Sequence, residues 1–390
     1  MSKFHSYIAS ASKIISTYVA GKPLAIHIKS FFASDKKFGS RDRRVIASLC
    51  YYYFRAGLAF KQNNLEERIL AGLFLCENKT NELLFFFRPD LDEKAGLPVT
   101  EKLSLLNKHS ADIFPLHDEL GAGINKEFFS QSFLKQPQVY LRIRPGRKRM
   151  VVDKLASASV NFELIGDDCL KLGNNVAADK ILKLNKDAVV QDMCSQKVFD
   201  YLEKEQAFLL TGEKIPAWDC CAASGGKSIL LFDKLKGNLQ LTVSDIRENI
   251  LLNLQKRLAQ AGINLNRSFI TDLSAGSGLS PEEKFSIIIC DVPCTGSGTW
   301  SRSPEQLYSF DKKMIDEYAD KQQKIVTNSI PHINTGGLFF YITCSVFKKE
   351  NEGMVTFIKE KFHLQLMQME YIKGYENVAD TMFVAVFQPG

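Results

Sequence analysis

An acid, a thiol and two glycines follow one apolar run of this sequence. The run, residues 285–290, suits a buried strand, and the block that continues it to residue 300 begins with Asp291 and contains Cys294. Open α/β sheets bind their ligands at the carboxyl ends of strands, so both side chains are expected at that edge. Cys344 follows a second predicted strand, residues 338–342, at the same edge. Two thiols in polar loops favour a nucleophilic role over that of small buried hydrophobic residues.

A glycine turn lies between a predicted strand at residues 217–221 and a predicted helix at residues 227–236. Such a turn lets a nucleotide-like ligand approach backbone N–H groups. The sequence Gly226-Lys227-Ser228 resembles the end of a phosphate-binding P-loop, but that motif needs glycine at position 221, where this chain has cysteine. The turn also lacks the G-x-G-x-x-G pattern, which disfavours a nicotinamide-dependent oxidoreductase.

Three acids stand at the ends of successive predicted strands: Asp245, Asp272 and Asp291. A carboxylate after the second strand can accept hydrogen bonds from ribose hydroxyls. Together with the glycine turn, the acids predict a nucleoside pocket, and their spacing leaves open whether the ligand is a dinucleotide or S-adenosylmethionine. None of the nine cysteines forms a C-x-x-C pair, which disfavours a metal site.

The composition is that of a globular protein of two or three domains, with 45% apolar and 24% charged residues among 390. No apolar run reaches membrane-spanning length, and the start of the chain lacks the apolar core of a secretory leader. The cysteines are therefore expected to be reduced thiols in the cytoplasm. Residues 1–150 carry 24 Lys and Arg against 14 Asp and Glu, whereas the whole chain carries 50 against 44. This N-terminal basic excess suits a part that binds a polyanion, although a solvated basic surface has the same charge.

Periodicity divides the chain into three parts. Residues 1–130 carry apolar residues at helical spacing, which predicts an all-α domain. Residues 138–166 predict a small strand–helix–strand unit that either contacts RNA or links the flanking domains. From about residue 190, beginning with a helix at residues 195–210, helices and strands alternate, which predicts a parallel sheet covered on both faces. The last two strands have no helix between them and are expected to form an antiparallel edge.

Three blocks of the sequence resemble the signature motifs of one enzyme family. They are C-C-A-A-S-G-G-K-S at residues 220–228, D-V-P-C-T-G-S-G-T-W at residues 291–300 and Y-I-T-C-S-V-F-K-K-E-N-E at residues 341–352. In order and spacing they are similar to those of the RsmB/Sun family of RNA cytosine-C5 methyltransferases. Residues 190–196 resemble the pre-catalytic segment of that family, and residues 39–44 resemble its NusB-like helical domain.

The resemblance implies three domains. These are an all-α NusB-like RNA-binding domain at residues 1–130, a small α+β RNA-contacting subdomain at residues 131–190 and a Rossmann-like, S-adenosylmethionine-dependent methyltransferase sheet at residues 191–390. The implied reaction is methylation of cytosine C5 in RNA, EC class 2.1.1, with 16S ribosomal RNA as the favoured substrate. The chain departs from the family pattern at Ser224, where proline is usual, at Val292, where alanine is usual, and at Ser301, which interrupts a usual arginine pair.

The same resemblance gives each site residue a role. Cys344 is the nucleophile that adds to C6 of the base, Cys294 assists product release, and Asp291 hydrogen-bonds the base. Lys227 supplies positive charge or orients the base. The implied cofactor pocket comprises Cys221, Ala222, Ala223, Ser224, Gly225, Gly226, Lys227, Asp245, Asp272 and Asp291. The predicted RNA contacts, from the basic clusters and the resemblance, are Arg41, Arg43, Arg44, Arg142, Arg144, Arg147, Lys148 and Arg302.

The expected partners are RNA and S-adenosylmethionine, without a metal or a membrane, and the chain is expected to be a monomer. Transfer RNA remains open as the substrate, and so does an exchange of roles between the two cysteines. A non-catalytic RNA-binding protein on the same fold is the competing interpretation. The intact cysteines, acids and glycine turn disfavour it.

Overall fold

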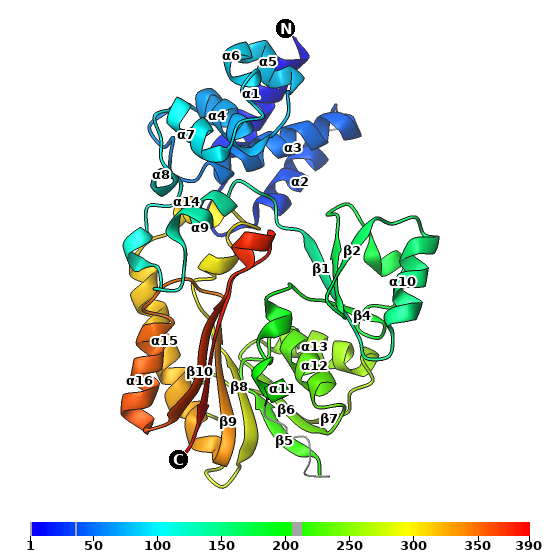
Figure 1. Cartoon of the computed structure of the whole chain (residues 1–390), viewed down its shortest axis with the longest axis vertical. Helices are drawn as coiled ribbons and strands as arrows, with labels where there is room; N and C mark the ends of the chain where they lie inside the picture. Colours follow the sequence, from blue (N-terminus) through cyan, green and yellow to red (C-terminus); the bar gives the residue numbers. More distant parts are fainter. Residues whose placement is uncertain (1, 36, 205–212) are drawn as a thin grey trace. The chain divides into compact units, whose positions relative to one another are not determined.

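The computed structural model describes residues 2–35, 37–204 and 213–390, and the chain divides into two compact units (Figure 1). The first unit comprises Met1–Leu120, Ile124–Pro137 and Thr299–Lys312, and the second comprises Gly121–Gly123, Gln138–Gly298 and Lys313–Gly390. The small α+β part, predicted as a separate domain, belongs to the second unit. The segment Thr299–Lys312, which begins within the block of residues 291–300 that contains Cys294, belongs to the first unit and was not predicted there.

The first unit is helical. Its helices are α1 (Lys3–Ser16), α2 (Leu24–Ser34), α3 (Ser40–Arg55), α4 (Leu65–Cys76), α5 (Glu82–Phe87), α6 (Pro89–Asp92), α7 (Val99–Leu105), α8 (Ser110–Ile113), α9 (Lys126–Ser132) and α14 (Glu305–Ser309). The apolar residues at helical spacing form its core, with Ile14, Ile46 and Phe54 at most 1% exposed. The inserted segment is fixed in this unit because Nη1 of Arg55 donates to the carbonyl oxygen of Ser301 at 3.0 Å. The predicted all-α part is confirmed.

The small sheet of the second unit is antiparallel, in the order β2-β3-β1-β4. Its elements are β1 (Val139–Ile143), α10 (Lys148–Ser157), β2 (Phe162–Ile165), β3 (Cys169–Leu172) and β4 (Ala188–Val190). Leu141, Val151, Leu155 and Leu170 are fully buried and pack together, so α10 covers one face of this sheet. The predicted strand–helix–strand is present, and two further strands complete the sheet.

The large sheet has the order β10-β11-β9-β8-β5-β6-β7. Its strands are β5 (Ile215–Asp219), β6 (Leu239–Asp245), β7 (Leu265–Ile270), β8 (Phe285–Asp291), β9 (Ile333–Thr343), β10 (Gln365–Ile372) and β11 (Met382–Gln388). The five strands from β5 to β9 are parallel, and β10 and β11 form the predicted antiparallel edge. Because β6 lies on one side of β5 and β8 on the other, the strand order reverses between β5 and β8. This switch point is where open sheets bind ligands.

Helices cover both faces of the large sheet (Figure 1). They are α11 (Tyr201–Lys204), α12 (Gly226–Lys234), α13 (Glu248–Gln260), α15 (Lys313–Ser329) and α16 (Glu352–Phe362). Leu231 of α12 and Leu254 of α13 pack against one face, and Val326 of α15 and Ile358 of α16 pack against the other. Of the helix predicted at residues 195–210, the structure shows a 3-10 turn, Ser195–Lys197, and α11, whereas residues 205–210 lie outside the described part of the chain.

Candidate active site

Lys227 and Asp291 meet at the switch point of the large sheet. Lys227 lies in the first turn of α12, which follows β5, and Asp291 is the last residue of the neighbouring strand β8. Nζ of Lys227 lies 2.6 Å from Oδ2 of Asp291, and the two side chains are 14% and 25% exposed. Burial alone lowers the pKa of Lys227, but the charges of Asp291 and Cys344 act in the opposite direction, so its pKa lies above the ordinary value. The site therefore holds an ammonium group close enough to Cys344 to stabilise a negative sulfur.

The two predicted cysteines lie side by side. Cys344 directly follows β9, Cys294 lies in the loop after the adjacent strand β8, and their Sγ atoms are 3.4 Å apart. The hydrogen bond with Cys344 is the largest cause that raises the pKa of Cys294 well above its usual range, and burial adds to it. Either sulfur could be the donor of this hydrogen bond, and the raised pKa of Cys294 favours the form in which Cys294 keeps its proton.

The glycine turn bends sharply between β5 and α12. Gly225 has a φ of 78°, and an added Cβ would lie 3.0 Å from Cγ of Leu254, so both the backbone and the space require glycine. A Cβ on Gly226 would meet nothing within 4 Å. The turn is tied to the neighbouring strand because the Ala222 N–H donates to the carbonyl oxygen of Ser244 at 3.0 Å. The turn thus offers a ligand an open approach to the backbone at the start of a helix.

Asp245 ends β6, and its carboxylate points toward the glycine turn. It accepts one hydrogen bond from the Ala223 N–H at 3.0 Å. It accepts three more from the backbone and guanidinium nitrogens of Arg247, at 2.9, 2.9 and 3.1 Å. Burial raises the pKa of Asp245, but these hydrogen bonds outweigh burial and its pKa is lowered. Asp245 is therefore an ionised hydrogen-bond acceptor beside the turn.

Asp272 differs from the other two predicted acids. It is exposed, lies two residues beyond the edge strand β7, and caps the following turn by accepting a hydrogen bond from Oγ of Ser274 at 2.6 Å. The hydrogen bonds from Ser274 lower its pKa. The three acids therefore have different surroundings: Asp291 pairs with a lysine, Asp245 faces the glycine turn, and Asp272 lies at the outer strand.

Two buried carboxyl groups at this edge of the sheet were not predicted. Asp219 ends β5 and accepts a hydrogen bond from Oγ of Ser228 at 2.5 Å, while its other oxygen has no hydrogen-bond partner among the described residues. Burial raises the pKa of Asp219 to about 7. Asp219 could have been predicted from its place at the end of a strand, which is the signal that identified Asp245. Glu350, in the loop after Cys344, is fully buried, and its signal was its place in the third sequence block.

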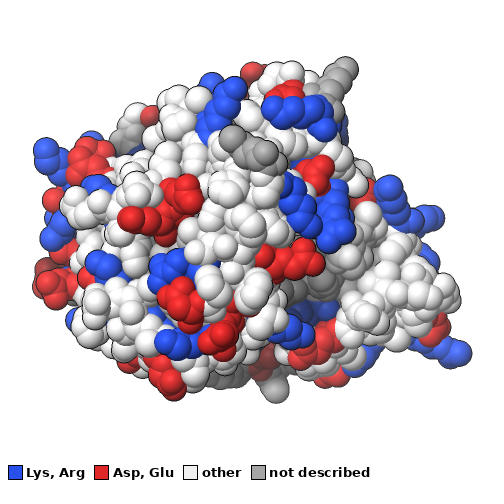
Figure 2. Space-filling model, turned by 90° about the horizontal axis from the view of Figure 1, so that it is seen from above, with Lys and Arg blue, Asp and Glu red and all other residues white. Residues whose placement is uncertain are grey.

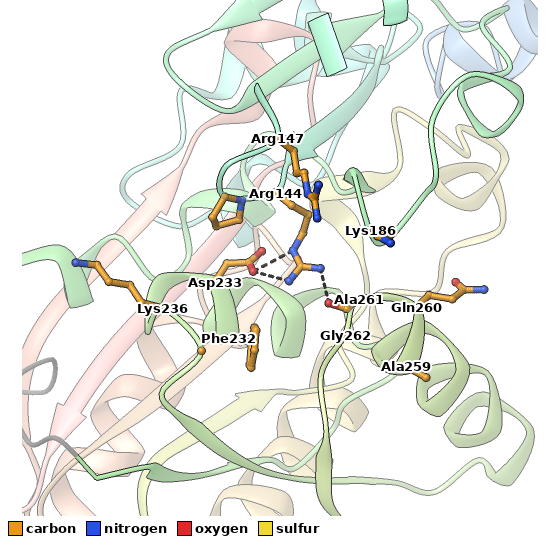
Figure 3. Close-up of a pocket in the computed structure, with 12 residues that line it drawn as sticks. Arg144, Arg147, Lys186, Phe232, Asp233, Lys236, Ala259, Gln260, Ala261 and Gly262 are labelled. Carbon is orange, nitrogen blue, oxygen red and sulfur yellow. Dashed lines mark hydrogen bonds and ion pairs between the residues drawn. The ribbon is translucent and has the colours of Figure 1, made fainter. Parts of the chain in front are cut away.

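Arg142 and Arg144, predicted as RNA contacts, are instead buried in ion pairs. Nη1 of Arg142 lies 2.6 Å from Oδ2 of Asp233 in α12, and its Nε donates to Gln191 at 2.9 Å. Arg144 binds the other oxygen of that carboxylate at 2.8 Å and caps the end of α13 through the Ala261 carbonyl at 2.9 Å (Figure 3). These arginines tie the small sheet to α12 and α13. The predicted RNA contact of Arg142 and Arg144 was wrong because the alternating sequence pattern of β1 does not show that Asp233 of α12 lies opposite these arginines.

Arg147 and Lys148 remain on the surface. Arg147 lines an open depression of about 640 Å³ together with Lys186 and Lys236 (Figure 3). Lys148 forms an exposed ion pair with Asp167 at 3.0 Å, an interaction that is worth little in water. The C-terminal ends of α12 and α13 border the depression. The carbonyl groups at a helix C-terminus attract cations, so they attract the same side chains that would bind a phosphate. RNA contact by Arg147 and Lys148 stays a prediction.

The predicted arginines of the helical unit also differ from one another. Arg41 and Arg44 are exposed at the start of α3, whereas Nε of Arg43 turns back to the Phe38 carbonyl at 2.8 Å. Arg302 is half-buried within the segment Thr299–Lys312. On the face shown in Figure 2, Lys and Arg side chains lie among Asp and Glu side chains rather than in one continuous basic field. Arg41 and Arg44 are thus the members of this group that face solvent most fully.

All nine cysteines are free thiols. The described part of the chain contains no cluster of three or more His, Cys, Asp or Glu side chains that could hold a metal ion. Within the same residues, no helix combines the length and the apolar character needed to cross a membrane.

Comparison with known proteins finds one family. The sequence matches the family described as 16S rRNA methyltransferase RsmB/F over residues 208–387. The probable ribosomal RNA small subunit methyltransferase B of Bacillus subtilis is 24% identical, over 54% of this chain and 46% of its own. The ribosomal RNA small subunit methyltransferase B of Klebsiella pneumoniae is 30% identical, over 43% of this chain and 37% of its own. The alignments thus span less than half of the length of these relatives.

Solved structures show the same fold. PH0851 matches 100% of this chain and 99% of its own, with a TM-score of 0.72 and 16% identity. NSun6 from Pyrococcus horikoshii, solved with SFG, matches 72% of this chain and 96% of its own, with a TM-score of 0.58 and 13% identity. The predicted Rossmann-like methyltransferase sheet is confirmed, whereas a NusB-like fold of the helical unit stays a prediction. In residues 208–387, which are 180 of its 390 residues, this chain is similar to the RsmB/F family of methyltransferases, and its fold is that of PH0851.

Proposed function

We propose that this protein transfers a methyl group from S-adenosylmethionine to C5 of a cytosine in RNA, with 16S ribosomal RNA as the favoured substrate. The observation that carries the proposal is the pair of thiols 3.4 Å apart beside the Lys227–Asp291 ion pair. Cytosine C5 is a poor nucleophile, so the ring needs covalent activation, and a second group must then remove the C5 proton. Two thiols on adjacent loops supply both functions. The names of the relatives support ribosomal RNA as the substrate.

The glycine turn and Asp245 suit S-adenosylmethionine. The open backbone at Gly226 admits the body of the ligand, and the carboxylate of Asp245 suits the ribose hydroxyls once Arg247 releases one of its hydrogen bonds. Asp272, at the outer strand, would contact the adenine side. S-adenosylmethionine bound there supplies an electrophilic methyl group.

Cys344 activates the base. Its thiolate, stabilised by Lys227 and by the S–H group of Cys294, forms a bond to C6 of cytosine. The electrons of the C5=C6 double bond then become available at C5, which attacks the methyl group. Asp291, held in its pair with Lys227, accepts a hydrogen bond from the base and favours protonation at N3, which stabilises the adduct.

Cys294 completes the reaction. When the sulfur of Cys344 is bonded to carbon it no longer carries charge, and its electrostatic contribution to the raised pKa of Cys294 is gone. Cys294 can then lose its proton to solvent and take the proton of C5. The electrons of that C–H bond restore the double bond, and Cys344 leaves as a thiolate.

Methyl transfer from tritiated S-adenosylmethionine tests the proposal, with undermethylated 16S ribosomal RNA in one arm and transfer RNA in the other. Label in 5-methylcytidine after digestion of the ribosomal RNA is the expected result. The Cys344→Ala variant should give no label, the Cys294→Ala variant should accumulate a protein–RNA adduct, and Cys76→Ala, in the helical unit, serves as the control. Absent binding of S-adenosylmethionine would overturn the proposal. A stable adduct through Cys294 in Cys344→Ala would reverse the roles of the cysteines.

A further inference from the structure

Glu350 connects the two cysteine loops. It is fully buried, and its carboxylate accepts four hydrogen bonds. Oε1 accepts from the backbone N–H of Thr295 at 2.9 Å and from Nε2 of Gln322 at 3.0 Å. Oε2 accepts from Oγ1 of Thr295 at 2.6 Å and from Oγ of Ser345 at 2.5 Å. Thr295 directly follows Cys294 and Ser345 directly follows Cys344, so one carboxylate binds the residue next to each thiol.

A second group of contacts holds the same carboxylate in place. Gln322, in α15, also donates to the carbonyl oxygen of Pro293 at 3.1 Å, on the other side of Cys294. The hydroxyl of Tyr341, in β9, donates to Oε1 of Gln322 at 3.0 Å and to the carbonyl oxygen of Glu350 at 2.7 Å. Glu350 is thus fixed from β9 and α15 as well as from the two loops.

The two loops also bind each other without Glu350. The N–H of Gly298 donates to the carbonyl oxygen of Cys344 at 2.8 Å, and the N–H of Val346 donates to Oγ of Ser297 at 2.9 Å. A change at position 350 would therefore leave the loops attached to each other. What it would change is the local geometry next to each sulfur.

The chemistry of the site makes that geometry important. Two thiols whose hydrogen bond depends on a separation of 3.4 Å lose it when either loop shifts by about 1 Å. A buried carboxylate with four donors is a stiff connection because each donor would otherwise be left unsatisfied. Burial raises the pKa of Glu350, while the donated hydrogen bonds act in the opposite direction.

We propose that Glu350 is a positioning residue that sets the separation between the sulfurs of Cys294 and Cys344. The inference rests on the proposed function for its catalytic consequence, but the separation of the sulfurs is a property of the protein alone. A change in this separation should therefore alter two quantities: the rate of methyl transfer, and the reactivity of the thiol pair toward a reagent that must bind two sulfurs at once.

The Glu350→Gln variant provides the test. Its amide has nearly the same shape, but its NH2 group faces donors where an oxygen accepted hydrogen bonds. The matched control is Glu352→Gln, two residues further on. Glu352 accepts hydrogen bonds from the Ala122 N–H at 3.0 Å and from the hydroxyl of Tyr371 at 2.7 Å, away from both thiols.

Phenylarsine oxide is the probe of the thiol pair. Its arsenic forms one bond to each sulfur, and the two thiol protons leave with its oxygen as water. Peptide mapping identifies the bridge between Cys294 and Cys344 and separates it from reaction at Cys220 and Cys221. We expect the bridge to form at least tenfold more slowly in Glu350→Gln than in wild type or Glu352→Gln, at a temperature where all three are folded.

Single-turnover methyl transfer is the second measurement. It should be roughly 100-fold slower in Glu350→Gln, with the Kd of S-adenosylmethionine unchanged, because a shift of about 1 Å at the reacting groups costs about that much. Bridging by the arsenical at the wild-type rate would overturn the inference, whatever the RNA measurement shows. Loss of bridging in Glu350→Gln, with no methyl transfer by wild type, would support the positioning role and overturn the proposed function instead.

Discussion

The two halves of the ligand edge of the large sheet are built differently. The loops after β8 and β9, which carry the thiols, are closed by hydrogen bonds between buried groups, such as those that Glu350 accepts. The glycine turn and the acids after β6 and β7 bind surface groups: the carboxylate of Asp245 pairs with the 56% exposed side chain of Arg247. The thiol half is therefore arranged before any ligand arrives, whereas the turn half must exchange protein partners for ligand.

Lys227→Met should have the largest effect, because Lys227 joins the two halves. Its removal takes the cation from Cys344 and leaves Asp291 without a partner, so kcat for methyl transfer should fall roughly 100- to 1,000-fold. Lys234→Met, on the same helix but paired with the exposed carboxylates of Asp200 and Glu203, should change kcat by less than about twofold. An unaltered rate in Lys227→Met would show that the halves work without this connection.

Asp245→Asn tests the turn half alone. The amide keeps the size but loses the charge that suits ribose hydroxyls, so the Kd of S-adenosylmethionine should rise roughly tenfold, with little change in the rate of the arsenical bridge. Calorimetric titration measures this Kd. Asp272→Asn should raise it by no more than about twofold because Asp272 is exposed at the outer strand. A larger rise of this Kd in Asp272→Asn than in Asp245→Asn would show that Asp272 contributes more to cofactor binding than Asp245.

The buried carboxyl of Asp219 predicts a pH dependence of stability. Its pKa is raised from 3.8 to about 7, so between these values the folded protein holds a proton that the unfolded chain has released. The stability that depends on this proton is complete below about pH 4 and is lost as the pH rises through about 7, at roughly 1 kcal/mol per pH unit. Urea unfolding at several pH values should show a shallower loss in Asp219→Asn. The same slope in both proteins would mean that Asp219 ionises normally.

Charge reversal in the helical unit should have the smallest effect. Arg41→Glu with Arg44→Glu should weaken RNA binding several-fold, because each removes one cation that can neutralise a phosphate. Neither half of the ligand edge is touched, so the Kd of S-adenosylmethionine and the rate of arsenical bridging should stay the same. Arg88→Glu, whose partner is Asp90, is the control for charge reversal elsewhere in the helical unit. Equal RNA affinity in the double variant and in wild type would remove these arginines from the RNA site.

The residues that end parallel strands could be predicted from the sequence. Apolar runs mark buried strands, and the carboxyl ends of parallel strands share one edge, so Asp245, Asp291 and Cys344 were expected together. The glycine turn was predictable for a similar reason, since its residues separate a strand from a helix. These inferences need only local patterns and one general rule of topology.

The contacts that depend on distant segments could not be predicted. Arg144 and its partner Asp233 are 89 residues apart, and nothing along β1 indicates that α12 carries a carboxylate opposite it. Thr295 and Glu350 are 55 residues apart and meet because β8 and β9 are neighbours, which only the strand order establishes. The membership of Thr299–Lys312 in the helical unit has the same origin. The monomeric state that was expected from the sequence also stays a prediction.

The attachment site of the RNA adduct tests the central claim most directly. The Cys294→Ala variant is incubated with S-adenosylmethionine and undermethylated 16S ribosomal RNA, the RNA is digested, and the modified peptide is sequenced by mass spectrometry. We expect a methylated cytidine bonded to Cys344. A wild-type enzyme that methylates RNA, with an adduct at any other residue or with none in Cys294→Ala, would contradict it.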